Sequence, residues 1–399
     1  MEKVLNYANP SWYAEGNKKQ GEAKLIEVID DLSDKIETEF PDDLDVQAEL
    51  HHKFAEVYTA KQINAKCLYH AEKALELRRR VYGEKHAEVA KDLFYLSAAK
   101  HYNANIIDSV KLGDQAIEMF REVAPDNPNL PYLLEDTANR YFDYYPDTEK
   151  AERYFTEALE IFRRKDGDNH VNTARSFMNL SMVFAKKGDI VKSDEFYREG
   201  EKRFKQLPDE NLRQYFIVVQ CRVLRAKGDF AGFEKLFENR LAELTKNGEG
   251  ESPLAIEISK GLGEHYYQTD NFEKAIERSK SNLTMENRQP FPDKYYIERS
   301  KANIAYCLLR LGKEVEARPY FEETFQEFKE SPNKNKWFYE STIGKCLFYL
   351  NRYQEAEPYL QHSLNEWKAN IPPSMQHQEL ADLLNRIGTK TTNLPHPNN

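Results

Sequence analysis

The sequence is poor in glycine and cysteine, and each shortage excludes a class of structure. Only 16 of the 399 residues are glycine, and they do not form the short, regularly spaced turn signals of a β-sandwich or barrel. The four cysteines lie far apart and form no C-x-x-C motif. We therefore expect small packing thiols rather than a disulfide framework or a zinc site.

Long apolar runs and an excess of positive charge are also absent. No stretch approaches the 18 apolar residues of a membrane span, and the first 20 residues lack the apolar core of a signal peptide. The formal net charge of −10 does not give the electrostatic signature of a nucleic-acid binder. These features predict a cytoplasmic protein with no membrane span that binds no nucleic acid.

The residues that are plentiful suit amphipathic helices. Charged residues make up 31% of the chain and hydrophobic residues 40%, a balance that gives each helix one buried stripe. Tyrosine and phenylalanine number 24 and 22, so the chain can bury a large core and is not disordered.

An internal repeat organises most of the sequence. A small residue recurs near the middle of every other expected helix, at intervals of 39 to 43 residues. This period accommodates two helices and a turn, so it predicts an all-α fold of about eight stacked helix pairs. The repeated positions are Ala55, Ser97, Ala138, Ser181, Cys221, Gly263, Ala305 and Gly344.

Each repeat has the same internal pattern. A turn residue that tolerates the left-handed backbone conformation is expected after the first helix; the positions are Gly188, Gly228, Asp270, Gly312 and Asn351. The second helix then has a small residue near its start and a large one a turn later, as in Ala317 with Phe321 and Ala356 with Leu360. This arrangement lets two helix backbones approach while large side chains fill the space between pairs.

Local motifs extend the pattern. Gly83-x-x-His86-x-x-Val89-Ala90 and Gly167-x-x-His170-x-x-Thr173-Ala174 are 84 residues apart, or two periods. EARPYF at 316–321 and EAEPYL at 355–360 place proline in the first turn of a helix, where the missing N–H has no consequence. With Asn179 and Asn303 at one position of the first helix, these motifs resemble the tetratricopeptide repeat, in the 42-residue variety of kinesin light chains and bacterial signalling proteins.

The resemblance implies a right-handed α-α superhelix of about eight helix pairs with a capping helix at each end. We expect one solenoid domain over 20–390, a front capping helix at 20–39, a rear capping helix at 376–390, and flexible tails at 1–19 and 391–399. The repeats, numbered 1 to 8, are expected at 45–86, 87–129, 130–170, 171–211, 212–253, 254–294, 295–335 and 336–374.

The sequence departs from the family pattern at several positions. Ala87 and Val171 replace the proline of the inter-repeat motif. In repeats 5 and 6, Phe233 stands where a small residue belongs, and Arg240 and Asn282 occupy the second small position. We expect the spacing between paired helices to be distorted in these two repeats.

No motif for catalysis, cofactor binding or metal binding emerges. The stretch SKGLGEHYY at 259–267 lacks the G-K-[ST] of a phosphate-binding loop and falls within an expected helix. No H-E-x-x-H or Cys/His ligand spacing occurs, and His51 and His52 should point to different faces of a helix. We therefore expect a protein that is not an enzyme, with no cofactor and no metal.

In the family that the chain resembles, the first helices line a concave groove in which extended peptides lie. The groove positions of repeats 4 to 8 are rich in cations, asparagine and tyrosine: Arg175, Asn179, Tyr215, Arg222, Arg225, Lys260, Tyr267, Arg299, Asn303, Tyr306 and Lys345. Arginine can pair with a carboxylate through two hydrogen bonds, asparagine can bond a peptide backbone, and tyrosine supplies contact area at a small entropic cost. We expect a partner protein or an extended, acidic peptide here.

Other interpretations of the groove and of its function stay open. Repeats 1 to 3 have Glu49, Glu56, Glu135 and Asp143 in the groove, so the groove is expected to be polarised. The cations could instead form inter-repeat ion pairs, each of which contributes little.

The main functional hypothesis is a non-catalytic scaffold that binds a protein or peptide. The alternative is a ligand-responsive sensor segment of a bacterial kinase or transcription regulator, whose output domain would lie outside this chain. The oligomeric state is left open.

Overall fold

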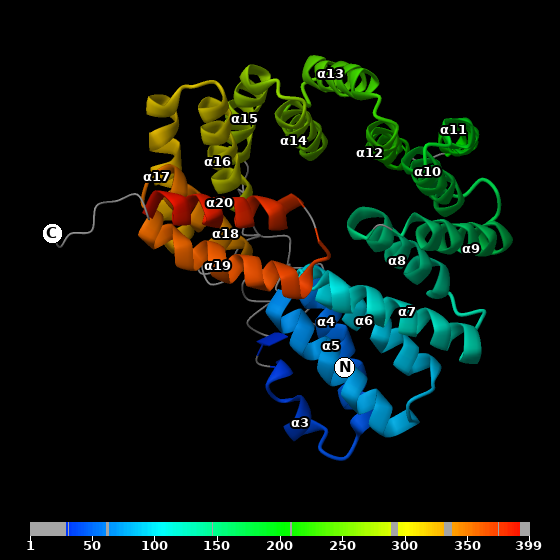
Figure 1. The fold of residues 1–399 in the computed structure, drawn as a ribbon. Helices are drawn as coiled ribbons and strands as arrows, with labels where there is room; N and C mark the ends of the chain where they lie inside the picture. Colours follow the sequence, from blue (N-terminus) through cyan, green and yellow to red (C-terminus); the bar gives the residue numbers. More distant parts are fainter. Residues whose placement is uncertain are drawn as a thin grey trace. The chain divides into compact units, whose positions relative to one another are not determined.

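A computed structural model describes residues 29–30, 32–60, 64–145, 147–207, 210–288, 294–330, 337–373 and 375–391. Over these residues the regular structure is entirely helical, with eighteen helices and no strand (Figure 1). Helices that are neighbours in the sequence pack as consecutive pairs. The prediction of an all-α fold built from stacked helix pairs is confirmed.

The chain divides into two compact units, Met1–Arg164 and Lys165–Asn399, called here the N-terminal and C-terminal units. The first contains α3 (Ile36–Glu39), α4 (Leu44–Ala60), α5 (Asn64–Tyr82), α6 (Ala87–Tyr102), α7 (Ile106–Val123), α8 (Leu130–Tyr144) and most of α9 (Thr148–Asp166). A single solenoid domain over 20–390, with the repeat bounds given above, stays a prediction.

The C-terminal unit has the remaining helices: α10 (Val171–Lys186), α11 (Ile190–Gln206), α12 (Glu210–Ala226), α13 (Phe230–Lys246), α14 (Pro253–Gln268), α15 (Phe272–Asn287), α16 (Lys294–Arg310), α17 (Glu314–Glu330), α18 (Trp337–Tyr349), α19 (Tyr353–Asn370) and α20 (Met375–Thr391). The last of these covers the segment where the rear capping helix is expected.

The turns within the helix pairs follow the sequence closely. All five residues expected to take the left-handed conformation have positive φ, from 57° at Asp270 to 80° at Gly188. Ala104, in the turn between α6 and α7, also has a positive φ of 59°. The sequence gives no signal for it, because alanine rarely adopts this conformation.

The two G-x-x-H motifs form the starts of first helices. The ring Nδ1 of His86 accepts a hydrogen bond from the backbone N–H of Glu88, and His170 accepts one from Asn172. Each histidine thereby satisfies one of the N–H groups that have no partner at a helix start. Ala87 and Val171 are the first residues of α6 and α10, the position where proline is tolerated.

The expected front helix at 20–39 is wrong in its described part. A turn at Asp34 and Lys35 separates the helical residues 29–30 and 32–33 from α3. The Asp30 carbonyl accepts hydrogen bonds from both the Ser33 hydroxyl, at 2.9 Å, and the backbone N–H of Asp34, at 3.1 Å. Residues 20–28 lie outside the described residues, as do both expected tails except for Thr391.

Repeats 5 and 6 differ from each other. In repeat 5, α12 packs against α13 more loosely than α10 packs against α11, and the buried Phe233 stacks on Phe237 where a small residue was expected. In repeat 6, α14 packs on α15 about as closely as α16 does on α17. Gly263 lies opposite Asn282, and the distortion expected in repeat 6 stays a prediction.

The core of the C-terminal unit continues into α20. Leu380, Leu383 and Ile387 are buried in the same apolar cluster as residues of α16 to α19. An end repeat cannot bury its own apolar face, so a terminal helix of this kind is needed.

Candidate functional site

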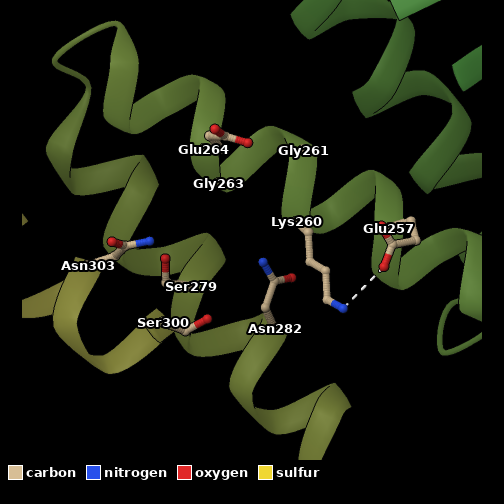
Figure 2. Close-up of a pocket in the computed structure, with 9 residues that line it drawn as sticks. All are labelled: Glu257, Lys260, Gly261, Gly263, Glu264, Ser279, Asn282, Ser300 and Asn303. Atoms are coloured by element: carbon tan, nitrogen blue, oxygen red, sulfur yellow. Dashed lines mark hydrogen bonds and ion pairs between the residues drawn. The ribbon is translucent and has the colours of Figure 1, made fainter. Parts of the chain in front are cut away.

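A cleft of about 220 Å³ opens between α14, α15 and α16, all in the C-terminal unit (Figure 2). The cleft extends from α14 to α16, which are the first helices of two successive pairs, and α15 lies between these two helices. The lining residues are Glu257, Lys260, Gly261, Gly263, Glu264, Ser279, Asn282, Ser300 and Asn303.

The sequence of α14 explains the position of one wall. The helix begins at Pro253, and the Ser252 hydroxyl accepts a hydrogen bond from the N–H of Ala255. In its middle, Gly261 allows close approach of α13, because a Cβ there would lie 2.8 Å from the ring of Phe237. Gly263 adds no side chain toward α15. Gly263 therefore leaves space between α14 and α15, and Gly261 lets α13 pack closely on α14.

Lys260 is the cationic group of the lining. Its Nζ lies 3.1 Å from a carboxylate oxygen of Glu257 and 3.5 Å from one of Glu286, and Figure 2 shows the first of these contacts. Glu286 is buried, so the pair is partly removed from water. Two carboxylates face one ammonium group here, and the charge of Lys260 is neutralised within the chain.

Amide and hydroxyl groups form the opposite side. Asn282 is 1% exposed, and its side-chain nitrogen donates to the backbone carbonyl of Ser259 at 3.2 Å. Asn303 is half-buried on α16, and Ser279 and Ser300 are buried beside the cleft. Carboxamides donate and accept at the same time, so this wall can pair with the N–H and C=O groups of another chain.

The lining consists of charged, amide and hydroxyl groups with two glycines and contains no histidine, cysteine or tyrosine. The described residues contain no group of three or more His, Cys, Asp or Glu side chains that could hold a metal ion. The cleft is also smaller than the 300–1,000 Å³ typical of small-molecule pockets.

Other predicted groove residues connect first helices of successive pairs. A guanidinium nitrogen of Arg225 on α12 donates to Gln268 on α14 at 2.7 Å. Lys345 on α18 pairs with Glu379 of α20 at 2.6 Å. The ring of Tyr306 on α16 meets that of Tyr349 on α18 edge to face, with centroids 5.4 Å apart.

Two of the predicted groove tyrosines have a raised pKa. Burial raises the pKa of Tyr306 well above its ordinary value. Burial, followed by the charge of Glu379, also raises the pKa of Tyr267, whose side chain remains 38% exposed. Both phenols therefore stay protonated at neutral pH and above it.

The remaining predicted groove residues give less information about a binding site. Asn179 is buried within α10 at 3% exposure, whereas Arg175 and Arg222 are half-buried and have interaction partners. The side chains of Tyr215 and Arg299 lie outside the described part of the structure. The structure thus brings Lys260 and Asn303 together in one cleft and places the other described residues along the neighbouring first helices.

Sequence reasoning missed most of the cleft lining. Asn282 appeared only as an irregularity, a polar residue where the repeat has a small one. That substitution was the available signal, because a buried amide needs polar partners. Glu257 and Glu264 resemble ordinary surface acids in the sequence, and nothing marks them as cleft residues.

A second cleft lies in the N-terminal unit between α7 and α9. Two of its three cations contact acids from the same cleft: Lys150 contacts Asp114 at 2.6 Å, and Arg121 pairs with Glu157. These are second helices of their pairs. The lining is Asp114, Glu118, Arg121, Lys150, Arg153, Tyr154 and Glu157. It contains no buried amide, so the α14–α16 cleft is the better candidate for binding a peptide backbone.

Comparison with known proteins supports the repeat assignment. The sequence model of the tetratricopeptide repeat matches residues 147–206. The crystal structure of apo RapI matches with a TM-score of 0.53 at 15% identity, over 71% of this chain and 98% of that one. The family model thus identifies tetratricopeptide repeats at residues 147–206, and the likeness to RapI shows a shared fold.

Two further solved structures are similar at lower scores. NprR in complex with its cognate peptide NprX has a TM-score of 0.48 at 14% identity, over 94% of this chain and all of that one. Kinesin-light-chain TPR-like repeats from Podosopora anserina have a TM-score of 0.42 at 15% identity, over 49% and 94%. No curated protein sequence matches the chain. Among the described helices, none has the length and hydrophobicity needed to cross a membrane.

Proposed function

We propose that this repeat protein is a non-catalytic scaffold that binds an extended segment of a partner protein along its first helices, with the α14–α16 cleft as the anchoring point. The observation that supports the proposal best is the composition of the cleft, in which carboxamide and hydroxyl groups of α15 and α16 face Lys260 of α14. An extended peptide has unpaired backbone N–H and C=O groups that need such partners.

The size of the cleft limits how much of a ligand it can hold. A volume of about 220 Å³ holds one or two residues of a peptide rather than a whole cofactor. An anchor of this kind orients the peptide, while the neighbouring first helices supply additional contacts. Tyr267, at the C-terminal end of α14, is exposed enough to take part.

The acidic character of the ligand is a separate part of the proposal. Lys260 and Lys345 already contact carboxylates of this chain. An acidic partner would therefore have to replace these internal acids. Exchange of one carboxylate for another adds little affinity, so acidic side chains would contribute to specificity more than to binding strength.

The test is a selection from a random peptide display library on the immobilised protein, followed by fluorescence anisotropy with the selected peptide. Asn303→Ala removes a carboxamide from the cleft and is expected to weaken binding about tenfold. Asn365→Ala removes an exposed asparagine from the second helix α19 and should leave the affinity unchanged. Equal affinities for the two variants would refute the cleft as the anchor.

The sensor alternative predicts a change of shape on binding, because a ligand must favour one of two conformations to be read by an output domain. Small-angle scattering with the selected peptide separates the hypotheses. A scaffold keeps its radius of gyration, whereas a sensor becomes more compact or more extended.

A further inference from the structure

Two histidine rings meet inside the helix packing of the N-terminal unit. His51 of α4 and His70 of α5 are 0% and 2% exposed, and their Nδ1 atoms lie 2.7 Å apart. The ring of Tyr58 stacks on His70 at 5.2 Å between centroids, and Phe54 contacts it edge-on at 5.6 Å. The contact therefore joins α4 to α5 in an aromatic environment.

The Nδ1–Nδ1 contact limits how many protons the pair can hold. A hydrogen bond between the rings needs one Nδ1 that carries hydrogen and one that offers a lone pair. Two neutral rings meet this condition, and so does one neutral ring beside one charged ring. If both rings were charged, two N–H groups would face each other with no acceptor between them. The pair accepts one extra proton and excludes a second.

The nearest charged groups favour the first proton and oppose the second. His51 Nε2 lies 3.4 Å from the carboxylate of Glu37 on α3, so the first proton is stabilised on His51. His70 is influenced by Lys66, whose Nζ contacts Asp30 at 2.6 Å. Since Asp30 is already paired, it offsets only part of a charge on His70.

Other charged groups on α5 have no net effect on a positive charge at His51. Lys73 and Glu76 both act on His51, but they are paired with each other at 3.1 Å. Their opposite charges largely cancel at the histidine.

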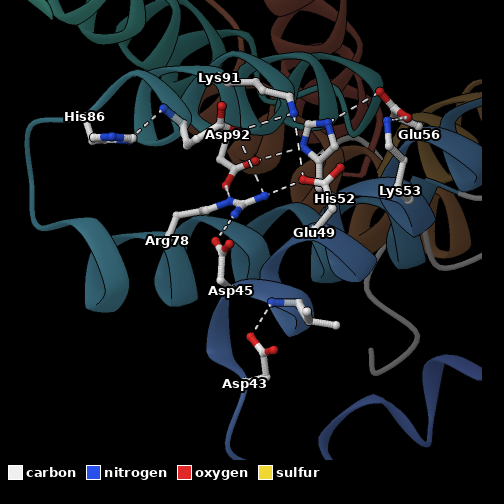
Figure 3. A network of polar contacts seen from close by, with 12 residues as sticks. Asp43, Asp45, Glu49, His52, Lys53, Glu56, Arg78, His86, Lys91 and Asp92 are labelled. Carbon is white, nitrogen blue, oxygen red and sulfur yellow. Dashed lines mark hydrogen bonds and ion pairs between the residues drawn. The ribbon is translucent and has the colours of Figure 1, made fainter. Parts of the chain in front are cut away.

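On the α6 side the polar groups form a separate network (Figure 3). His52 contacts Asp92 of α6 at 2.8 Å through its Nδ1. Arg78 of α5 lies 3.4 Å from the other oxygen of Asp92. The carboxylate of Asp92 is thus occupied and does not face the His51–His70 pair.

We propose that His51 and His70 form an acid-sensitive lock between α4 and α5, in which protonation of both rings breaks their contact and loosens this helix pair. Burial lowers the pKa of both rings, and the charge on His51 helps to bring the pKa of His70 to about 4. Because these pKa values lie below the ordinary value of 6.5, the stabilising contact is complete above pH 6.5. It is lost as the pH falls toward 4.

The thiol of Cys67 reports on the opening of this helix pair. Cys67 lies on α5, three residues before His70, and is 2% exposed; loosening of α4 from α5 uncovers it. Cys346 is buried in the C-terminal unit and serves as an internal reference. Below the pKa of both thiols the thiolate fractions fall equally with pH, so the ratio of their labelling rates depends on exposure alone.

The experiment labels the full chain with 4,4′-dithiodipyridine at pH 7.5 and pH 5.0 and measures each cysteine by mass spectrometry. The ratio of the Cys67 rate to the Cys346 rate is expected to rise at least tenfold at pH 5.0. In His70→Phe, which keeps an aromatic ring without a titratable group, the ratio should stay constant. A constant ratio in the native chain, or an equal rise in His70→Phe, overturns the proposal.

Two further variants complete the design. His70→Asn keeps a hydrogen-bonding group without a titratable ring, and replaces His70→Phe as the decisive variant if circular dichroism shows that the latter is misfolded. His362→Gln changes an exposed histidine on α19 whose pKa is raised by its hydrogen bond to Glu340, a shift of the opposite sign. His362→Gln must show the same rise as the native chain, and loss of the rise in this variant would also refute the lock.

Discussion

At the scale of single residues, the least replaceable groups are buried and charged. Asp92 is 1% exposed and is shared between His52 and Arg78. Arg78 is buried as well and also pairs with Asp45 and Glu49. Removing one member of such a network leaves a buried charge without compensation.

Arg78→Met is therefore expected to lower the free energy of unfolding of the N-terminal unit by about 3 kcal/mol. Urea unfolding at pH 7.5, followed by circular dichroism, measures this change. The neighbouring Arg79 has a partly exposed side chain that pairs with the exposed Glu84, so Arg79→Met should cost less than about 0.5 kcal/mol. Similar costs for both variants would show that the network contributes no special stability.

The small residue of each first helix can be tested in repeat 8. A Cβ on Gly344 would lie 2.8 Å from the side chain of Leu360 and 3.1 Å from its backbone nitrogen. Gly344→Val should therefore lower the free energy of unfolding by about 2 kcal/mol through overpacking. Gly388→Ala, where an added Cβ meets no described atom within 4 Å, should raise it by up to about 1 kcal/mol. Tryptophan fluorescence during urea unfolding reports both, and a tolerated Gly344→Val would contradict close packing of α18 and α19.

Residue by residue, the sequence reveals less of the candidate site than of the core. Helical spacing placed Lys260 and Asn303 on first helices, and both line the cleft. Spacing could not reveal that Lys260 contacts Glu286 or that Lys345 contacts Glu379. These ion pairs join side chains of separate helices, and their geometry depends on how the helix pairs stack.

At the scale of helices and turns, prediction worked where local chemistry is specific. Glycine, asparagine and aspartate tolerate positive φ, so the five expected turns were found. The front helix is interrupted by a turn at Asp34 and Lys35, and apolar periodicity alone gives no signal for this turn.

Ala104 offers a direct test of turn chemistry. Its φ of 59° is costly for an L-residue with a Cβ, so Ala104→Gly should raise the unfolding free energy by about 1 kcal/mol. Gly188 occupies the corresponding turn between α10 and α11 with a φ of 80°, and Gly188→Ala should lower it by a similar amount. Thermal unfolding of the two variants should shift in opposite directions, and a shift of the same sign would contradict this explanation.

The contact between α18 and α20 gives a prediction about binding. Lys345 is mostly buried and its ammonium group is occupied by Glu379. Glu379→Gln removes this internal carboxylate, so the affinity for a selected acidic peptide should rise about threefold and its salt dependence should increase. Glu357→Gln on α19 changes the same net charge at an exposed site and serves as the control. Equal effects of both variants would indicate a change of overall charge rather than the release of Lys345.

At the scale of the whole molecule, the fold is predictable because it is repetitive. Each helix pair buries its apolar face only against its neighbours, so one sequence pattern recurs along the chain. The division near residue 164 was not predictable. The interval from Ala138 to Ser181 is 43 residues, only one residue longer than the next longest interval, which is too small a difference to mark a boundary.

The most direct test of peptide anchoring in the α14–α16 cleft is hydrogen–deuterium exchange of the full chain with and without a display-selected peptide. We expect slower exchange in α14 and α16 when the peptide is bound, with no change in the second helices α11 and α19. Protection confined to second helices, with α14 and α16 unchanged, would contradict the proposal.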